Sequence, residues 1–301
     1  MFEIILNKIL PIIAIYFIGF ISKKLKIFNK KSGELFLKLV FYLGLPSLII
    51  TSFAKIEISQ ELFLIPISAV IVFFTVFFIS YIFTILTGIK GKNRGTFLIA
   101  TMIMNIGFVL PFFITIFKSE GLAKMSLFNF GNGFLVMTFA YITACKYGSD
   151  ATDFKKILKK VLSSPPIWAI IIGLLINFFN LTVPVSVDAL LNEFGNTVVP
   201  LTMLALGIYF NPRFKNFKIS FAAFSIRTFA GLILGILMAA IFNLDGLNAI
   251  TVIVGASAPV GYNTLTFSTM ENLNKELAAS IVSMSIIFSL IFIPLLILIL
   301  K

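Results

Sequence analysis

Two short polar segments interrupt otherwise apolar stretches of this chain, and they contain the residue types best suited to binding a ligand. They are Asn105–Pro111 (NIGFVLP) and Gly255–Thr264 (GASAPVGYNT). Proline removes a backbone donor and clashes with the preceding turn, and glycine leaves helical dihedrals easily, so each segment predicts an opened helix. Because the N-terminal end of a helix carries partial positive charge, a helix that restarts after such an opening suits an anion.

The candidate substrate-binding residues come from these segments and from the next apolar stretch. A single proline in a membrane helix is usually only a kink, but two matched motifs, each with an amide nearby, favour a binding site. Asn132 is included because it shares a helix face with Asn129; the pair either reaches the site or bonds neighbouring helices. The candidates are Asn105, Gly107, Pro111, Asn132, Pro259, Gly261 and Asn263.

Ionisable groups inside the apolar stretches are scarce. No Asp or Glu falls at the centre of a stretch, which argues against a proton antiporter based on a carboxylate. Glu34, Glu193 and Asp245 lie near predicted stretch ends. Lys38 is close enough to an end to extend its charge to the surface. Arg227 lies deeper, and two roles stay open for it: binding an anionic substrate, or satisfying carbonyl groups at helix ends.

The absence of other chemical groups excludes several classes of protein. The sequence contains no His and a single Cys, Cys145. Imidazole bases, His-ligated metals and multi-Cys metal sites are therefore excluded. No phosphate-binding loop of the ATPase type is present. We expect no cofactor, no bound metal and no enzymatic activity.

The composition is that of a membrane protein. Of the 301 residues, 59% are hydrophobic and 12% are charged, and the mean hydropathy is +1.08. Soluble chains carry roughly 25% charged residues. The net charge of +12 would suggest nucleic acid in a soluble protein, but here it indicates cytoplasmic loops, and no nucleic-acid partner is expected.

Apolar runs separated by charge clusters predict ten membrane-spanning helices. Each is long enough to cross a hydrocarbon core of about 30 Å, and none has the alternating pattern of a membrane β-barrel strand. The predicted spans are 3–22, 32–54, 62–87, 96–117, 122–145, 164–181, 189–210, 219–242, 246–269 and 276–300.

The distribution of basic residues predicts the orientation. Seventeen Lys and Arg residues lie in the loops after odd-numbered spans, against five at the opposite face. Basic loops stay cytoplasmic, so both termini are expected outside the cytoplasm, in a multi-pass protein of the cell (inner) membrane.

The longest charged connection, 146–163, separates five spans in 1–145 from five in 164–301. An odd number of spans in each half predicts an inverted repeat within one integral domain. The prolines support it, since Pro46 and Pro111 in the first half have counterparts in Pro200 and Pro259.

The ordered set of segments resembles the auxin efflux carrier family, which includes bacterial malate or malonate permeases. The matching segments are, in order, Gly19-Phe20, the proline-bearing Leu39–Pro46, Arg94–Phe97, the Asn105 segment, Ser164–Trp168, Val199–Leu201 with Gly207, and Pro259 with Asn263. One departure concerns the fourth span. Asn105 and Pro111 are six residues apart rather than seven, and a glycine of the family pattern is missing, which leaves the register of Asn105 open.

The resemblance implies a fold in which ten helices form a 5+5 inverted repeat, with broken helices 4 and 9 crossing as in bile-acid/sodium symporters. It implies a scaffold of helices 1, 2, 6 and 7, and a moving transport domain of helices 3–5 and 8–10. It also implies organic-anion substrates, elevator-type alternating access, and the lipid bilayer and a second copy at the scaffold helices as partners.

The sequence therefore predicts a secondary carrier for a small organic anion, such as a carboxylate or an auxin-like acid. The alternative is a channel or membrane sensor of the same architecture. Sodium coupling through Ser257, Asn263 and Thr264 stays open, as does movement driven by the membrane potential.

Overall fold

Helices form the regular secondary structure in the part of the chain that the computed structural model describes, which comprises residues 3, 5–56, 61–148, 163–210 and 216–301. One isolated antiparallel β-bridge joins Met104 and Val260 within these residues. The connection 146–163 lies mostly outside the described residues, so its predicted position is not addressed by the structure.

The helices are those expected of a multi-pass membrane protein. Among the described residues, seven helical segments are long and apolar enough to cross a membrane, and there are two shorter apolar helices, Pro165–Phe178 and Gly246–Ala256. The described helices begin and end close to the predicted spans. The prediction of an all-helical polytopic membrane protein is therefore confirmed, whereas the count of ten spans remains a prediction.

The chain divides into two compact units. Unit 1 comprises Met1–Ser59, Gly107–Ser126 and Leu162–Phe210, and unit 2 comprises Gln60–Ile106, Leu127–Val161 and Asn211–Lys301. Neither unit is a continuous half of the sequence, because each draws segments from both halves.

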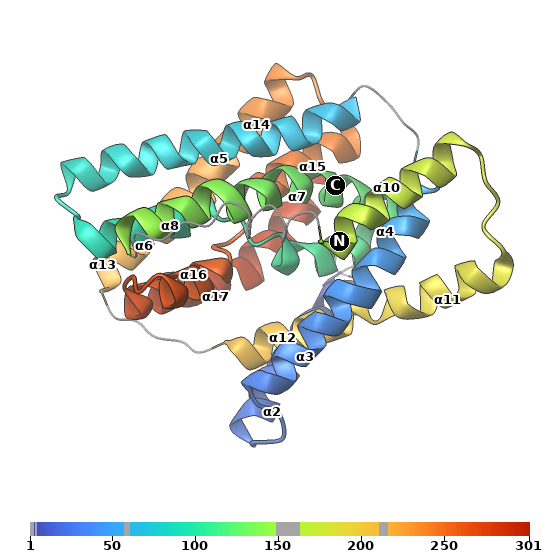
Figure 1. The fold of residues 1–301 in the computed structure, drawn as a ribbon, viewed down its shortest axis with the longest axis horizontal. Helices are drawn as coiled ribbons and strands as arrows, with labels where there is room; N and C mark the ends of the chain where they lie inside the picture. The colour runs from blue at the N-terminus through green and yellow to red at the C-terminus, as the bar shows by residue number, and fades with distance from the viewer. Residues whose placement is uncertain (1–2, 4, 57–60, 149–162, 211–215) are drawn as a thin grey trace. The chain divides into compact units, whose positions relative to one another are not determined.

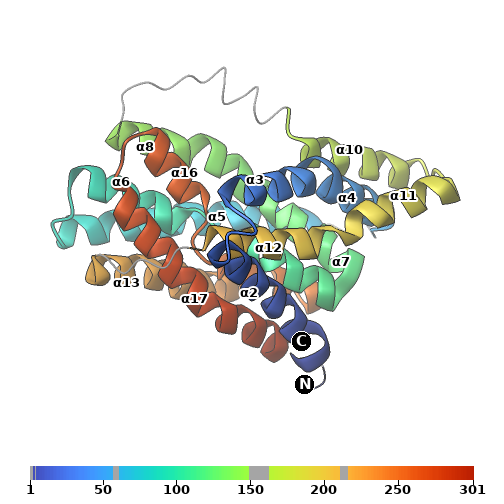
Figure 2. The same cartoon turned by 90° about the horizontal axis from the view of Figure 1, so that it is seen from below.

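Unit 1 is built around paired helices that come close together. Its elements are η1 (Ile5–Ile9), α2 (Leu10–Lys24), α3 (Lys30–Leu39), η2 (Val40–Gly44), α4 (Leu45–Phe53), the first part of α7 (Ile106–Leu135), α10 (Pro165–Phe178), α11 (Val185–Asn196) and α12 (Val198–Tyr209). Helices α2 and α12 pack most extensively (Figure 2). Gly19 lies against the carbonyl of Leu204, and Gly207 against that of Tyr16, where an added Cβ would overlap the neighbouring backbone. Small residues at such positions let membrane helices approach closely.

Polar side chains tie α4 to its two neighbours in unit 1. The Asn177 amide of α10 donates to the carbonyls of Ala54 (3.1 Å) and Ile56 (2.9 Å), beyond the end of α4. These contacts satisfy carbonyl groups that the helix end leaves without partners.

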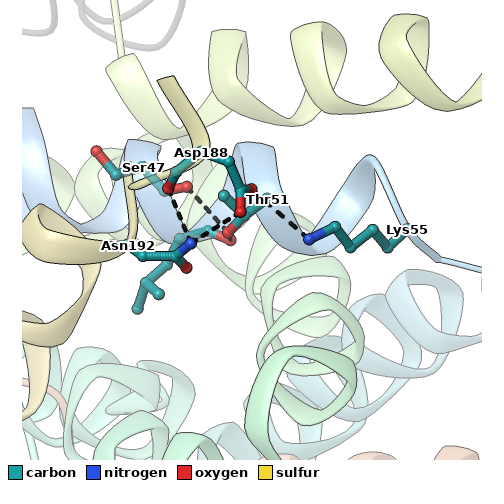
Figure 3. A network of polar contacts seen from close by, with 6 residues as sticks. Ser47, Thr51, Lys55, Asp188 and Asn192 are labelled. Carbon is teal, nitrogen blue, oxygen red and sulfur yellow. Dashed lines mark hydrogen bonds and ion pairs between the residues drawn. The ribbon is translucent and has the colours of Figure 1, made fainter. Parts of the chain in front are cut away.

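A second polar network lies between α4 and α11 (Figure 3). The Thr51 hydroxyl donates to the carbonyl of Ser47 one turn earlier, at 3.2 Å. From the end of α4, Lys55 reaches the Asp188 carboxylate at 3.6 Å, and the Asn192 amide donates to the same carboxylate at 3.1 Å. Because the Lys55 side chain is 68% exposed, this ion pair is expected to contribute little to stability.

Unit 2 contains the remaining helices. They are α5 (Glu61–Leu86), α6 (Gly91–Met102), α7 from Leu127 onward, η3 (Val136–Ala140), α8 (Tyr141–Tyr147), α13 (Phe217–Ser225), η4 (Ile226–Ala230), α14 (Gly231–Ile241), α15 (Gly246–Ala256), α16 (Asn263–Met270) and α17 (Lys275–Leu300). Figure 1 shows α16 and α17 side by side. The Asn274 side chain caps α17 at Leu277 and also donates to Asn93 of α6 at 2.8 Å.

Helix α7 consists of two helices rather than one. Lys118 has φ 54° and ψ −140°, far from helical values, so the chain turns there. This residue lies at the boundary that the sequence predicts between the fourth and fifth spans.

Candidate functional site

Two helices of unit 2 end in the middle of the predicted spans. Helix α6 ends at Met102, Ile103 has an extended conformation (φ −78°, ψ 112°), and α7 starts at Ile106. Helix α15 ends at Ala256, and α16 starts at Asn263. The second predicted opening is present, at 257–262. The first lies at 103–105 and overlaps the predicted segment Asn105–Pro111 only at Asn105, because Gly107 and Pro111 are within helix α7.

The two interruptions pair with each other as short antiparallel strands. The Asn105 N–H donates to the Pro259 carbonyl at 2.8 Å, and the Gly261 N–H donates to the Ile103 carbonyl at 2.9 Å. Met104 and Val260 lie opposite each other between these bonds. Backbone that lipid cannot satisfy is thus satisfied by a segment 155 residues away in the sequence. We refer to the paired segments 103–105 and 257–262 as the crossing.

Gly261 lies at a close approach within the crossing. A Cβ at this position would overlap the side chain of Ile103. A larger residue would therefore separate the two paired segments.

The Asn132 side chain brackets the backbone of Met104. Its Oδ1 accepts from the Met104 N–H at 3.4 Å, and its Nδ2 donates to the Met104 carbonyl at 3.2 Å. The same Nδ2 lies 3.3 Å from Oδ1 of Asn129. Asn132 is only 3% exposed, whereas Asn129 is exposed. The sequence left open whether this pair reaches the site or bonds neighbouring helices, and Asn132 is the member of the pair that contacts the crossing.

Helix α17 contributes a residue that the sequence analysis missed. The Ser285 hydroxyl accepts a hydrogen bond from the Val260 N–H at 2.9 Å. The Val260 carbonyl lies 3.5 Å from the Asn105 amide. A run of serines along α17, Ser280, Ser283, Ser285 and Ser289, was the available signal, but helix periodicity alone does not single out Ser285.

Arg227 bridges the ends of both interrupted helices. Its guanidinium donates to the carbonyl of Thr101, in the last turn of α6, at 2.9 Å, and to the carbonyl of Ala256, the last residue of α15, at 2.5 Å. The side chain is fully buried. The sequence left two roles open for Arg227, binding an anionic substrate or satisfying carbonyl groups at helix ends, and these contacts correspond to the second.

The Arg227 contact depends on local backbone features. Arg227 lies in η4, a π-helical segment between α13 and α14, and such segments often occur at functional sites. Gly231, the first residue of α14, adjoins the contact, since a Cβ there would overlap the Ala256 carbonyl and the guanidinium.

Three other candidates lie at the starts of the helices that follow the crossing. Asn263 is the first residue of α16 and is half-buried. Gly107 is exposed and Pro111 is buried in the first turns of α7, among residues that group with unit 1. Thr264, next to Asn263, is fully buried, and its hydroxyl has no partner among the described residues.

Arg227 and Glu271 are the two charged side chains that are buried in the described part of the chain. Glu271 is 5% exposed at the end of α16, where the Tyr141 hydroxyl donates to its carboxylate at 2.8 Å. The sequence analysis did not single it out, because it lies between two predicted spans. Glu193 and Asp245 are exposed, and Lys38 forms an exposed ion pair with Glu34 at 2.9 Å.

No group of three or more potential metal ligands of the His, Cys, Asp and Glu types occurs among the described residues. The polar groups of the crossing are instead amides, hydroxyls and backbone dipoles, together with Arg227. Such groups can bind and orient an ion or small molecule, but they form no evident acid–base pair.

Comparison with known proteins identifies the family. Residues 4–297 match the family model described as membrane transport protein. The chain belongs to the membrane transport protein family. This is the auxin efflux carrier family, so the resemblance found in the sequence is confirmed.

Two archaeal members of the membrane transport protein family align with nearly the whole chain. An uncharacterized transporter of Methanothermobacter thermautotrophicus is 26% identical over 296 residues, which cover 96% of each protein. An uncharacterized transporter of Methanocaldococcus jannaschii is 24% identical over 300 residues, which cover 96% of this chain and 97% of that protein.

Proposed function

We propose that this transporter is a secondary carrier of small organic anions and that its substrate binds at the crossing. The observation that carries the proposal is the pairing of the two interruptions. Non-helical backbone at membrane depth is tolerated when protein buries it or when it lines a water-filled cavity, and transporters use such breaks to bind substrates.

The chemistry of the crossing supports an anion. Helices α7 and α16 both begin there, and neither has an acidic residue in its first turn. Each N-terminal end carries a partial positive charge of roughly half a unit. Asn105 and Asn263 add amide groups at the same two helix starts, and amides orient a carboxylate by hydrogen bonds.

The proposed mechanism is elevator-type alternating access in a protein of ten spans with a 5+5 inverted repeat. Two observations support it: the family match, and the division of the chain into two compact units, one of which contains the crossing. In this mechanism the unit with the crossing carries the substrate, while α2 and α12, packed at close range, belong to the static scaffold.

Uptake into proteoliposomes tests the proposed substrate class. Purified protein is reconstituted and offered a panel of radiolabelled mono- and dicarboxylates. We expect saturable uptake of at least one of them, above protein-free liposomes and above the Asn263→Ala variant. Absence of uptake for the whole panel, with the protein folded and inserted, contradicts the proposal. Uptake that rises linearly with concentration instead supports the channel alternative.

A further inference from the structure

The charge of Arg227 is already engaged within the protein. The C-terminal ends of α6 and α15 each carry a partial negative charge of roughly half a unit. The guanidinium binds one carbonyl at each end, at 2.9 and 2.5 Å. One positive charge therefore balances two half charges, and the three groups together are close to neutral.

The partial positive charges at the starts of the helices that follow the two interruptions have no such opposing charge. Helices α7 and α16 start at the crossing with no acidic residue in their first turns. Their two N-terminal ends together carry roughly one positive charge. In the first turn of α16, the Thr264 hydroxyl is fully buried and has no partner among the described residues, so a hydrogen-bond donor is available there.

The buried carboxylate of Glu271 makes a second negative charge on the substrate less favourable still. Glu271 lies at the far end of α16, about 12 Å along the helix from Asn263 at 1.5 Å per residue. Its carboxylate accepts a hydrogen bond from Tyr141. Among the described residues of unit 2, Arg227 is the only buried cation, so no further positive side chain awaits a second carboxylate there.

We infer that Arg227 is a positioning residue that holds the two interrupted helices together, and that the crossing consequently prefers substrates with one negative charge. This inference rests on the proposed function. A second carboxylate would enter the site without a buried cationic side chain as a partner, so the hydration that it loses on binding would not be replaced by a charged group, which is unfavourable.

Matched pairs of ligands test the preference for one charge. Malonate, succinate and phthalate are compared with their monomethyl esters, which keep nearly the same size but carry one charge at pH 7.5. We expect the monoester to inhibit uptake, or to stabilise the purified protein, at concentrations at least about tenfold lower than its parent diacid, since an unpaired buried group is costly. A diacid that matches or exceeds its monoester overturns the inference.

A disulfide tests the positioning role without any substrate. Met104 and Val260 form an antiparallel pair flanked by hydrogen bonds, for which the Cα atoms are about 4.5 Å apart, within disulfide range. Met104→Cys and Val260→Cys are introduced together in a Cys145→Ala background, and oxidation is followed by gel mobility.

The disulfide is then compared between Arg227 variants. We expect Arg227→Gln to slow its formation by about tenfold or more, the loss expected for a hydrogen bond to a charged group, and Arg227→Lys to restore part of the rate. If Arg227 instead binds the substrate directly, Arg227→Gln weakens anion binding and leaves the disulfide rate unchanged, which overturns the positioning role.

Glycine variants keep the test decisive if Arg227→Gln does not fold. Gly231→Ala pushes against the Ala256 carbonyl and the guanidinium while keeping the charge, so we expect a slower disulfide. Gly133→Ala, where an added Cβ meets nothing within 4 Å, is the matched control and should leave the rate unchanged. If no ligand pair binds, the proposed substrate class is refuted together with the charge preference, and the disulfide rates still decide the role of Arg227.

Discussion

Replacing Asn132 by Ala perturbs the crossing at a point where the effect can be worked out. The side chain serves both backbone groups of Met104, at 3.4 and 3.2 Å, from a position only 3% exposed. The substitution leaves a buried N–H and a buried C=O without these partners. Each unsatisfied buried group costs about 1–3 kcal/mol.

The lower end of that range applies here. Both bonds are long, and hydrogen bonds between membrane helices average only about 0.6 kcal/mol in measured cases. We therefore expect Asn132→Ala to lower the free energy of unfolding by about 2 kcal/mol. For a chain of 301 residues that corresponds to a melting temperature roughly 3 °C lower.

Asn129→Ala is the control for this prediction. Asn129 is exposed, and the contact that it makes with Asn132 does not involve the crossing. Thermal unfolding of the purified protein in detergent measures both variants, and proteoliposome uptake measures their activity. If Asn132→Ala melts at the same temperature as Asn129→Ala and transports normally, the bracketing role of Asn132 is refuted.

Three further predictions concern the site, the packing of unit 1 and its surface. Asn105→Ala and Asn263→Ala should each weaken substrate affinity about tenfold or more, because each loses a hydrogen bond to a charged ligand, and should cause little loss of folded protein. If binding and transport are unchanged in both variants, these amides do not contact the substrate. Gly207→Leu should reduce the yield of folded protein severely, because the side chain meets the α2 backbone at Tyr16; a normal melting curve would contradict the close approach. Lys55→Ala should change the free energy of unfolding by less than about 1 kcal/mol, since its ion pair is exposed, and a larger change would show that this pair is more than a surface contact.

The second break could be located from the sequence because its cause is local, whereas the first was predicted several residues too far along the chain. Pro259 and Gly261 lie within the interruption 257–262 and disfavour a continuous helix whatever surrounds them. Pro111 and Gly107, by contrast, are within helix α7, after the break at 103–105. The structure places Asn105 at the end of the first interruption, with its N–H on Pro259. The missing glycine of the family pattern had left this register open.

The partners of the crossing could not be predicted, because they come from distant parts of the chain. Arg227 is 126 residues from Thr101, and periodicity does not reveal which carbonyls a buried guanidinium reaches. Ser285 resembles the other serines of α17 until Val260 is placed beside it. Glu271 lies between two predicted spans, directly after α16, and only tertiary packing against Tyr141 shows that it is buried.

Counterflow in proteoliposomes tests the central claim most directly. Vesicles are loaded with an unlabelled carboxylate that the protein transports and are diluted into a trace of the same labelled compound. A carrier whose binding site alternates between the two sides should accumulate label transiently above its equilibrium level, and Asn263→Ala should reduce this accumulation. Label that only approaches equilibrium, with an initial rate independent of the internal substrate, would contradict alternating access at the crossing.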